Sequence, residues 1–297
     1  MALTDKNVAL LRRLAEEHKK RISDALHELE RRVAAYAIAA PVDGDQLFDL
    51  AWSLRARNDL RQMIEETYLA EVQSIVEEYP QIEASTMAML KKFDNFVGVE
   101  REMIVGLQTL SFRGFEAIAS QQLETLAEQM YQYTLIGGSR ADMVEKLRQQ
   151  INGVYMASDK DEIQRLVEIA QTSSNKKEVE AAVEKLHKEY AADRTGTNMR
   201  RYATQMTQDS IMQFHQSISK RVGDELGVTR WRYSGSIKLN SRDFCIETIN
   251  GENGRIYTTE ELKRRWQGSW GGKSGSDPWL NRGGYNCTHV LDPVVDE

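Results

Sequence analysis

The sequence contains only two cysteines among 297 residues, too few for the disulfide framework of a secreted domain. We therefore expect the chain to fold in a reducing compartment, the cytoplasm by default. The start, MALTDKNVALLRRLAEEHKK, has no apolar core of signal-peptide length. The longest apolar stretch, VAAYAIAAPV at 33–42, is much shorter than the about 20 residues that a membrane helix needs. Neither a signal peptide nor a membrane span is expected.

An excess of basic residues is also missing, since the formal net charge is −6. General nucleic-acid binders normally carry a basic excess or a clustered basic face, so the composition argues against that class. A hydrophobic content of 41% is enough to build a sizeable core. At about 150 residues per domain, the length suits about two domains of a globular protein.

Amphipathic helices are predicted over almost all of residues 1–220, because apolar residues recur three and four positions apart. The stripes predict long helices over about 5–36, 46–78 and 87–136, and another over 196–226. Charged residues fill the opposite faces, which is typical of solvated helix surfaces rather than of binding sites. This region is expected to form a bundle or an extended arm.

Start and stop signals divide this helical region further. Pro80 is expected to end the second helix, and the glycine at Gly137 to end the third. Ser139 resembles the first residue of a capping box, and Ser158 and Ser174 suggest two further helix starts.

The composition changes after Gly227. Residues 221–297 contain 11 of the 19 glycines, and four of the five tryptophans lie there as well. Lys plus Arg and Asp plus Glu each number 11 in that part, so the net charge of −6 lies wholly in the first 220 residues. We predict a helical region over 1–194, a connecting helix over 195–227 and a separate module over 228–297.

The module is predicted to be mostly β with one helix. Trp231 and Tyr233 alternate with arginines in TRWRYSGS, which predicts a strand. The segment SRDFCIETINGENGRIYT suggests a second extended stretch, a turn and a third strand. TEELKRRWQ follows as a capped helix, and NCTHVLDPV as a closing strand. The whole chain is therefore expected to be an α+β protein.

Two pairs of side chains in the module could hold a metal. On extended strands alternate side chains share a face, so Cys287 and His289 are expected to point the same way, as are Asp243 and Cys245. If the two strands are neighbours, these four side chains could surround a structural zinc ion. The spacing within each pair is unlike the usual zinc motifs, and Asp is an uncommon structural ligand.

The interpretation that we favour is structural, with no cofactor. Both cysteines would be small buried hydrophobes, and His289 would donate to a backbone carbonyl and hold the chain end. A nucleophile and base pair is disfavoured, because residues i and i+2 on one strand do not approach and no third orienting group is evident. We therefore predict no catalytic residues. The residues predicted to have a structural role are Trp231, Tyr233, Phe244, Tyr257, Asn286, Cys287 and His289.

An ordered series of short motifs in the last 70 residues resembles the C-terminal module of tailed-phage head morphogenesis proteins, the Mu F-like or minor head protein family. The series is WRYSGS, SRDFC, NGENGRIYTTEEL and GGYNCTHVLDPV. The chain has Thr288 where the family usually has arginine, so an anion contact made by that arginine is not expected here. Residues 1 to about 190 fit the family only as a helical extension.

The resemblance implies a non-enzymatic virion protein located in the head near the portal vertex, and in the host cytoplasm during assembly. Its expected partners are the portal protein and other head proteins, and the chain itself is expected in multiple copies in the virion. It would assist head assembly, genome packaging or delivery. Contact with packaged DNA is compatible with that place. The alternatives are an internal virion protein ejected with the DNA and, from a different class, a nuclease or cell-wall hydrolase that uses His289.

Overall fold

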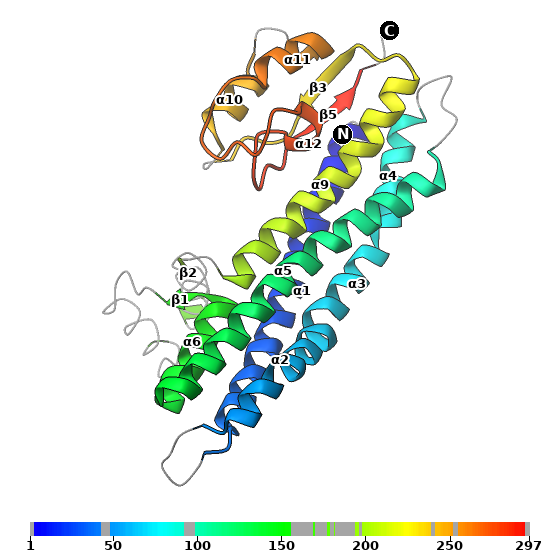
Figure 1. Cartoon of the computed structure of the whole chain (residues 1–297). Coiled ribbons are helices and arrows are strands. Elements are labelled where there is room, and N and C mark those ends of the chain that lie inside the picture. Colours follow the sequence, from blue (N-terminus) through cyan, green and yellow to red (C-terminus); the bar gives the residue numbers. More distant parts are fainter. Residues whose placement is uncertain are drawn as a thin grey trace. The chain divides into compact units, whose positions relative to one another are not determined.

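Long amphipathic helices make up most of the computed structural model (Figure 1). It describes residues 3–42, 48–91, 99–155, 198–238, 241–251 and 255–294, with short pieces at 169, 177–178, 181 and 194–195. The helices are α1 (Leu3–Ile38), α2 (Leu50–Ile64), the π-helix η1 (Glu65–Leu69), α3 (Ala70–Glu77), α4 (Tyr79–Leu90), α5 (Arg101–Ile136), α6 (Arg140–Asn152) and α9 (Met199–Glu225). Together with a small C-terminal sheet they form an α+β fold, as predicted.

The apolar stripe of the first helix is buried as expected, with Leu11, Ile22, Leu26 and Leu29 all inaccessible to solvent. The single helix expected over about 87–136 is wrong, since α4 ends at Leu90 and α5 begins at Arg101. The second helical stretch ends before Pro80 as expected, because α3 ends at Glu77 and a new helix, α4, begins at Tyr79. Pro80 lies in the first turn of α4, where its missing N–H costs nothing because no carbonyl would accept it. None of the helices in the described part of the chain combines the length and hydropathy of a membrane-crossing segment.

The chain forms two compact units. The first contains residues 1–24, 68–117 and 203–297, and the second contains residues 25–67 and 118–202. The first unit has aromatic and polar contacts at its centre. The ring of Tyr79 meets that of Phe214 edge to face, with the centroids 4.9 Å apart, and its hydroxyl lies 2.8 Å from Ser210 Oγ.

The second unit is held by caps, stacking and ion pairs. Asp49 caps α2, and Trp52 in the first turn of that helix stacks on Tyr36 with the ring centroids 5.1 Å apart. Ser139 caps α6 as predicted. A short antiparallel pair of strands, β1 (Val154–Tyr155) and β2 (Arg194–Thr195), also belongs to this unit. The helix starts predicted near Ser158 and Ser174 lie outside the described residues.

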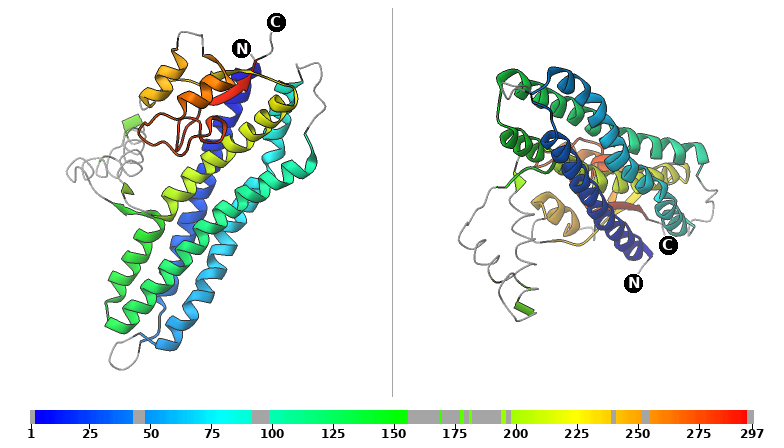
Figure 2. Two further views of the ribbon diagram at one scale, coloured as in Figure 1. Left: turned by 45° about the horizontal axis from the view of Figure 1, so that its top comes forward. Right: turned by 90° about the horizontal axis from the view of Figure 1, so that it is seen from below.

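The C-terminal module, coloured yellow to red in Figure 2, contains a three-stranded antiparallel sheet in the order β4-β3-β5. The strands are β3 (Arg230–Ser234), β4 (Ile256–Thr258) and β5 (Val290–Pro293), and the helices are α10 (Asp243–Ile249), α11 (Thr259–Arg265) and α12 (Pro278–Asn281). Trp231 pairs with Tyr257 on one side of β3, and Tyr233 pairs with Leu291 on the other. Helix α11 is the expected one, and its capping box joins Thr258 and Glu261.

The expected second strand of the module is wrong, since residues 243–249 form helix α10. One face of α10 is buried. Its residues follow Phe244 at positions i+1, i+4 and i+5, which is the spacing of one helix face, and they are Cys245, Thr248 and Ile249. The aromatic and β-branched residues of this segment favoured a strand locally. Burial of this face in the module core overrides that weak local preference.

Helix α9 lies alongside the edge strand β5 (Figure 1). The fully buried Gln216 side chain donates to the carbonyl oxygen of Leu291 at 2.6 Å and accepts from its N–H at 2.8 Å. The module therefore shares polar contacts with α9 as well as having its own apolar core. The boundary near residue 228 stays a prediction, and the compact first unit contains the module together with residues 203–227.

Candidate functional site

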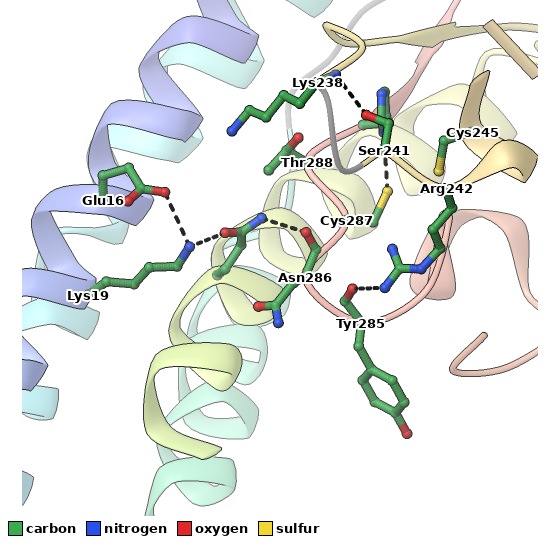
Figure 3. Close-up of a pocket in the computed structure, with 12 residues that line it drawn as sticks. Glu16, Lys19, Lys238, Ser241, Arg242, Cys245, Tyr285, Asn286, Cys287 and Thr288 are labelled. Carbon is green, nitrogen blue, oxygen red and sulfur yellow. Dashed lines mark hydrogen bonds and ion pairs between the residues drawn. The ribbon is translucent and has the colours of Figure 1, made fainter. Parts of the chain in front are cut away.

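A polar pocket of about 400 Å³ lies in the first unit, beside the two cysteines (Figure 3). It is lined by residues of α1, α9, α10, the segment before α10 and the segment before β5. The lining residues are Glu16, Lys19, Gln208, Lys238, Ser241, Arg242, Cys245, Tyr285, Asn286, Cys287, Thr288 and His289. Three cationic side chains and one carboxylate thus face the same space as two sulfurs and an imidazole.

Helix α10 places Cys245 at this site. Arg242 is the residue before the helix, and its guanidinium donates to the carbonyl oxygen of Tyr285 at 2.6 Å, which joins α10 to the segment before β5. Cys245 follows in the first turn and is buried. Asp243 is exposed and does not belong to the cluster formed by Cys245, Cys287 and His289. Its expected place beside Cys245 is wrong, because residues two apart diverge on a helix.

Cys287 and His289 lie in an irregular segment before β5, which begins at Val290. Gly284 and Asn286 there have φ angles of +103° and +58°, so the chain bends sharply instead of continuing as a strand. Helix α9 holds the bend. Gln208 donates to the Asn286 carbonyl at 2.9 Å, and Asp209 accepts from the Asn286 N–H at 3.1 Å.

The bend brings Cys287 and His289 into direct contact, with Sγ and Nδ1 3.4 Å apart. The expectation that these side chains do not approach is therefore wrong, because it assumed a regular strand. The Tyr233 ring stacks on the imidazole at a centroid distance of 5.2 Å, and its hydroxyl lies 3.5 Å from Cys245 Sγ and 3.6 Å from Cys287 Sγ. The expected bond from His289 to a backbone carbonyl is also wrong, since Nδ1 contacts the sulfur and Nε2 has no partner among the described residues.

The pKa values of the two cysteines shift in opposite directions. A hydrogen bond from the Cys245 thiol lowers the pKa of Cys287 well below its ordinary value, and contact with His289 acts in the same direction. The same hydrogen bond and burial raise the pKa of Cys245. Burial raises the pKa of Tyr233, so this phenol stays protonated. Two cysteine sulfurs and an imidazole thus form a set of ligand types that zinc prefers.

A buried ion pair stands next to the bend. Arg282 is 1% exposed, has a φ angle of +45°, and donates to Asp209 Oδ1 at 3.0 Å. Burial raises the pKa of Asp209 to about 6, although Arg282 and the Asn286 N–H oppose this shift. Asp209 therefore binds both Arg282 and the bend, so it fixes the position of Cys287 from α9.

The residues predicted to be structural take different places. Trp231, Tyr233 and Phe244 lie in the module core with both cysteines. Tyr257 is half-buried and donates to the carbonyl oxygen of Thr248 at 2.6 Å. Asn286 is exposed, and its contacts with α9 are made by its backbone.

Several residues that shape the site carry no signal in the sequence. Gln208 and Asp209 are polar residues of a helix about 80 positions away from the residues that they bind. Thr288 accepts a hydrogen bond from Arg12 at 3.4 Å, a contact across 276 positions. Gly283 was one of many glycines, yet a side chain there would overlap Cys245 Sγ and lie 3.0 Å from Cys287 Sγ.

The chain was compared with family models, with curated proteins and with solved structures. None of the three comparisons gives a match.

Proposed function

We propose that this chain is a minor head protein of a tailed phage that associates with the portal vertex and assists head assembly or genome delivery. The observation that carries the proposal is the ordered motif series of the last 70 residues, from WRYSGS to GGYNCTHVLDPV. Such a series is more specific than any of its short members, because each must occur in the right order.

The structure gives these motif residues related roles, which supports treating the series as one unit. Trp231 and Cys245 share a core with Cys287. Thr258 and Glu261 form the reciprocal capping box at the start of α11. Residues whose positions depend on one another in a single fold are expected to occur together, whereas residues scattered over unrelated sites are not.

A head protein of this kind needs surfaces for other virion proteins. Helix α2 exposes Leu50 and Leu54, one turn apart, with 51% and 65% of their surfaces accessible. Two exposed leucines on one helix face can contribute apolar contacts to a surface that binds another protein. We propose that this face of α2 contributes to contact with the portal.

The direct test is co-expression of the full chain with the portal protein of the same phage, followed by affinity purification and size-exclusion chromatography. We expect the portal to co-purify, and Leu54→Glu to weaken its recovery. The matched control is Gln121→Glu, which adds the same charge at an exposed position of another helix, α5. A folded chain that retains neither the portal nor any other head protein contradicts the proposal.

Two further measurements separate the alternatives. Mass spectrometry of particles before and after DNA release tests ejection. A minor head protein is expected in the emptied particle, whereas an ejected internal protein is lost from it. Hydrolysis of DNA or peptidoglycan by the wild type, lost in a folded His289→Ala variant, would replace the structural role with an enzymatic one.

A further inference from the structure

Cys245, Cys287 and His289 form a compact cluster of metal-ligating side chains. All three are buried, and one ligand atom from each lies within 4.8 Å of the others. The ligands come from two segments, α10 and the bend before β5, which are about 40 positions apart in the sequence. Both cysteines are free thiols, so no disulfide occupies their sulfurs.

The spacing of the cluster suits tetrahedral coordination. Bonds of about 2.3 Å to sulfur and about 2.0 Å to nitrogen place the ligand atoms of a tetrahedral zinc ion about 3.5 to 3.8 Å apart. The distance from Cys287 Sγ to His289 Nδ1 is 3.4 Å. A shift of a few tenths of an ångström therefore brings this pair to the distance of two ligands on one ion.

The residues around the two sulfurs leave space for them and offer a hydrogen-bond donor to them. Gly283 has no side chain, and a Cβ at this position would lie against both sulfurs, so glycine keeps the space between the two segments open. On another side the Tyr233 hydroxyl lies 3.5 and 3.6 Å from the sulfurs, where it can donate to a metal-bound thiolate. All three ligands also line the polar pocket.

We propose that Cys245, Cys287 and His289 bind one Zn²⁺ ion, whose fourth ligand is a water molecule or a small anion in the pocket. Two sulfurs and an imidazole favour zinc over magnesium or calcium, which prefer oxygen ligands. The ion would join α10 to the segment before β5, so its binding would stabilise the module. This proposal replaces the simpler packing role that we favoured from the sequence, because the structure brings Cys245 within 4.8 Å of the ligand atoms of Cys287 and His289.

The test uses the full chain, purified under reducing conditions without chelators and incubated with Zn²⁺ before dialysis. Metal analysis is expected to find about one zinc ion per chain. Replacement of zinc by Co²⁺ is expected to give the visible bands of tetrahedral cobalt and a near-ultraviolet thiolate band. Cys245→Ser, Cys287→Ser and His289→Asn should each lose most of the metal. Asp243→Asn is the matched control, and it should keep the metal because Asp243 is exposed and outside the cluster.

A measurement on the wild type alone covers the case in which a ligand variant does not fold. Titration of Zn²⁺ into the metal-free wild type in competition with a chromophoric zinc chelator should show one tight site per chain, because the three ligands converge on one ion. Less than about a tenth of an equivalent of zinc on the folded wild type would overturn the proposal. A metal-free chain whose mass is lower by two hydrogens would also overturn it, since the cysteines then form a disulfide. Retention of full metal by a folded Cys245→Ser variant would show that the cluster is not the site.

Discussion

Substitution of Gln216 tests the contact between α9 and the module most directly. Its side-chain amide satisfies both the N–H and the C=O of Leu291, at 2.8 and 2.6 Å, on the side of β5 away from β3. Gln216 is fully buried, and so is Leu291. In the variant Gln216→Ala both backbone groups lose their partner in a place that water reaches poorly.

The cost follows from the two unpaired groups. Each buried backbone group left without a partner costs about 1–3 kcal/mol, so we expect Gln216→Ala to lower the free energy of unfolding by about 2–5 kcal/mol. Alanine has the higher helix propensity, but this offsets only a few tenths of a kcal/mol. The expected fall in the free energy of unfolding therefore comes from the two lost hydrogen bonds to β5 and not from a weaker α9 helix.

Urea unfolding followed by tryptophan fluorescence is a suitable assay, because four of the five tryptophans lie in the module. Gln213→Ala is the matched control, since Gln213 is an exposed glutamine of the same helix. Hydrogen exchange of the Leu291 amide should become faster in Gln216→Ala and stay unchanged in the control. Equal urea midpoints for the two variants would refute the assigned role of Gln216.

Three further substitutions have definite expected outcomes. Gly223→Ala should lower the free energy of unfolding by about 1–3 kcal/mol, because the added Cβ overlaps the fully buried indole of Trp231; an unchanged or raised urea midpoint contradicts this. Thr258→Ala should cost about 1 kcal/mol through loss of the α11 cap, and Thr258→Ser should restore it in the same assay. Burial lowers the pKa of His18 from 6.5, although the Glu78 carboxylate opposes the shift. The unfolded chain then binds the His18 proton first, so stability is lost as pH falls below about 6.5, and the difference in urea midpoint between the wild type and His18→Gln should shrink over that range.

Much of the fold could be predicted from the sequence because most elements are long and strongly periodic. The stripe in α1 and the start of α6 at Ser139 follow from side-chain spacing and capping, which are local properties. Residues 243–249 were assigned wrongly, as a strand, because a short element depends less on local properties. The state of a seven-residue helix is decided by what it packs against, and the local sequence does not contain that information.

The candidate site was predictable only in part. Sequence spacing drew attention to Cys287 and His289, and the prediction that Cys245 lies beside them is confirmed. The prediction that Asp243 joins them is wrong. The error came from one assumption, that the segments around Cys245 and Cys287 are strands. The bend depends on the positive φ angles of Gly284 and Asn286, and the residue types around them do not predict those angles.

Helix α9 explains why the bend could not be predicted from the module alone. A polar residue in a helical stripe predicts a solvated position, yet Gln208, Asp209 and Gln216 are buried and bind the backbone of the segment that follows Arg282. Their partners satisfy them only once α9 lies against that segment, which is a property of the tertiary structure. The ligand geometry at Cys287 thus depends on α9 as much as on the residues around the sulfur. A fragment that begins after Gly227 keeps every proposed ligand but loses the contacts that place two of them, so metal affinity should depend on α9 even though none of its residues touches the metal.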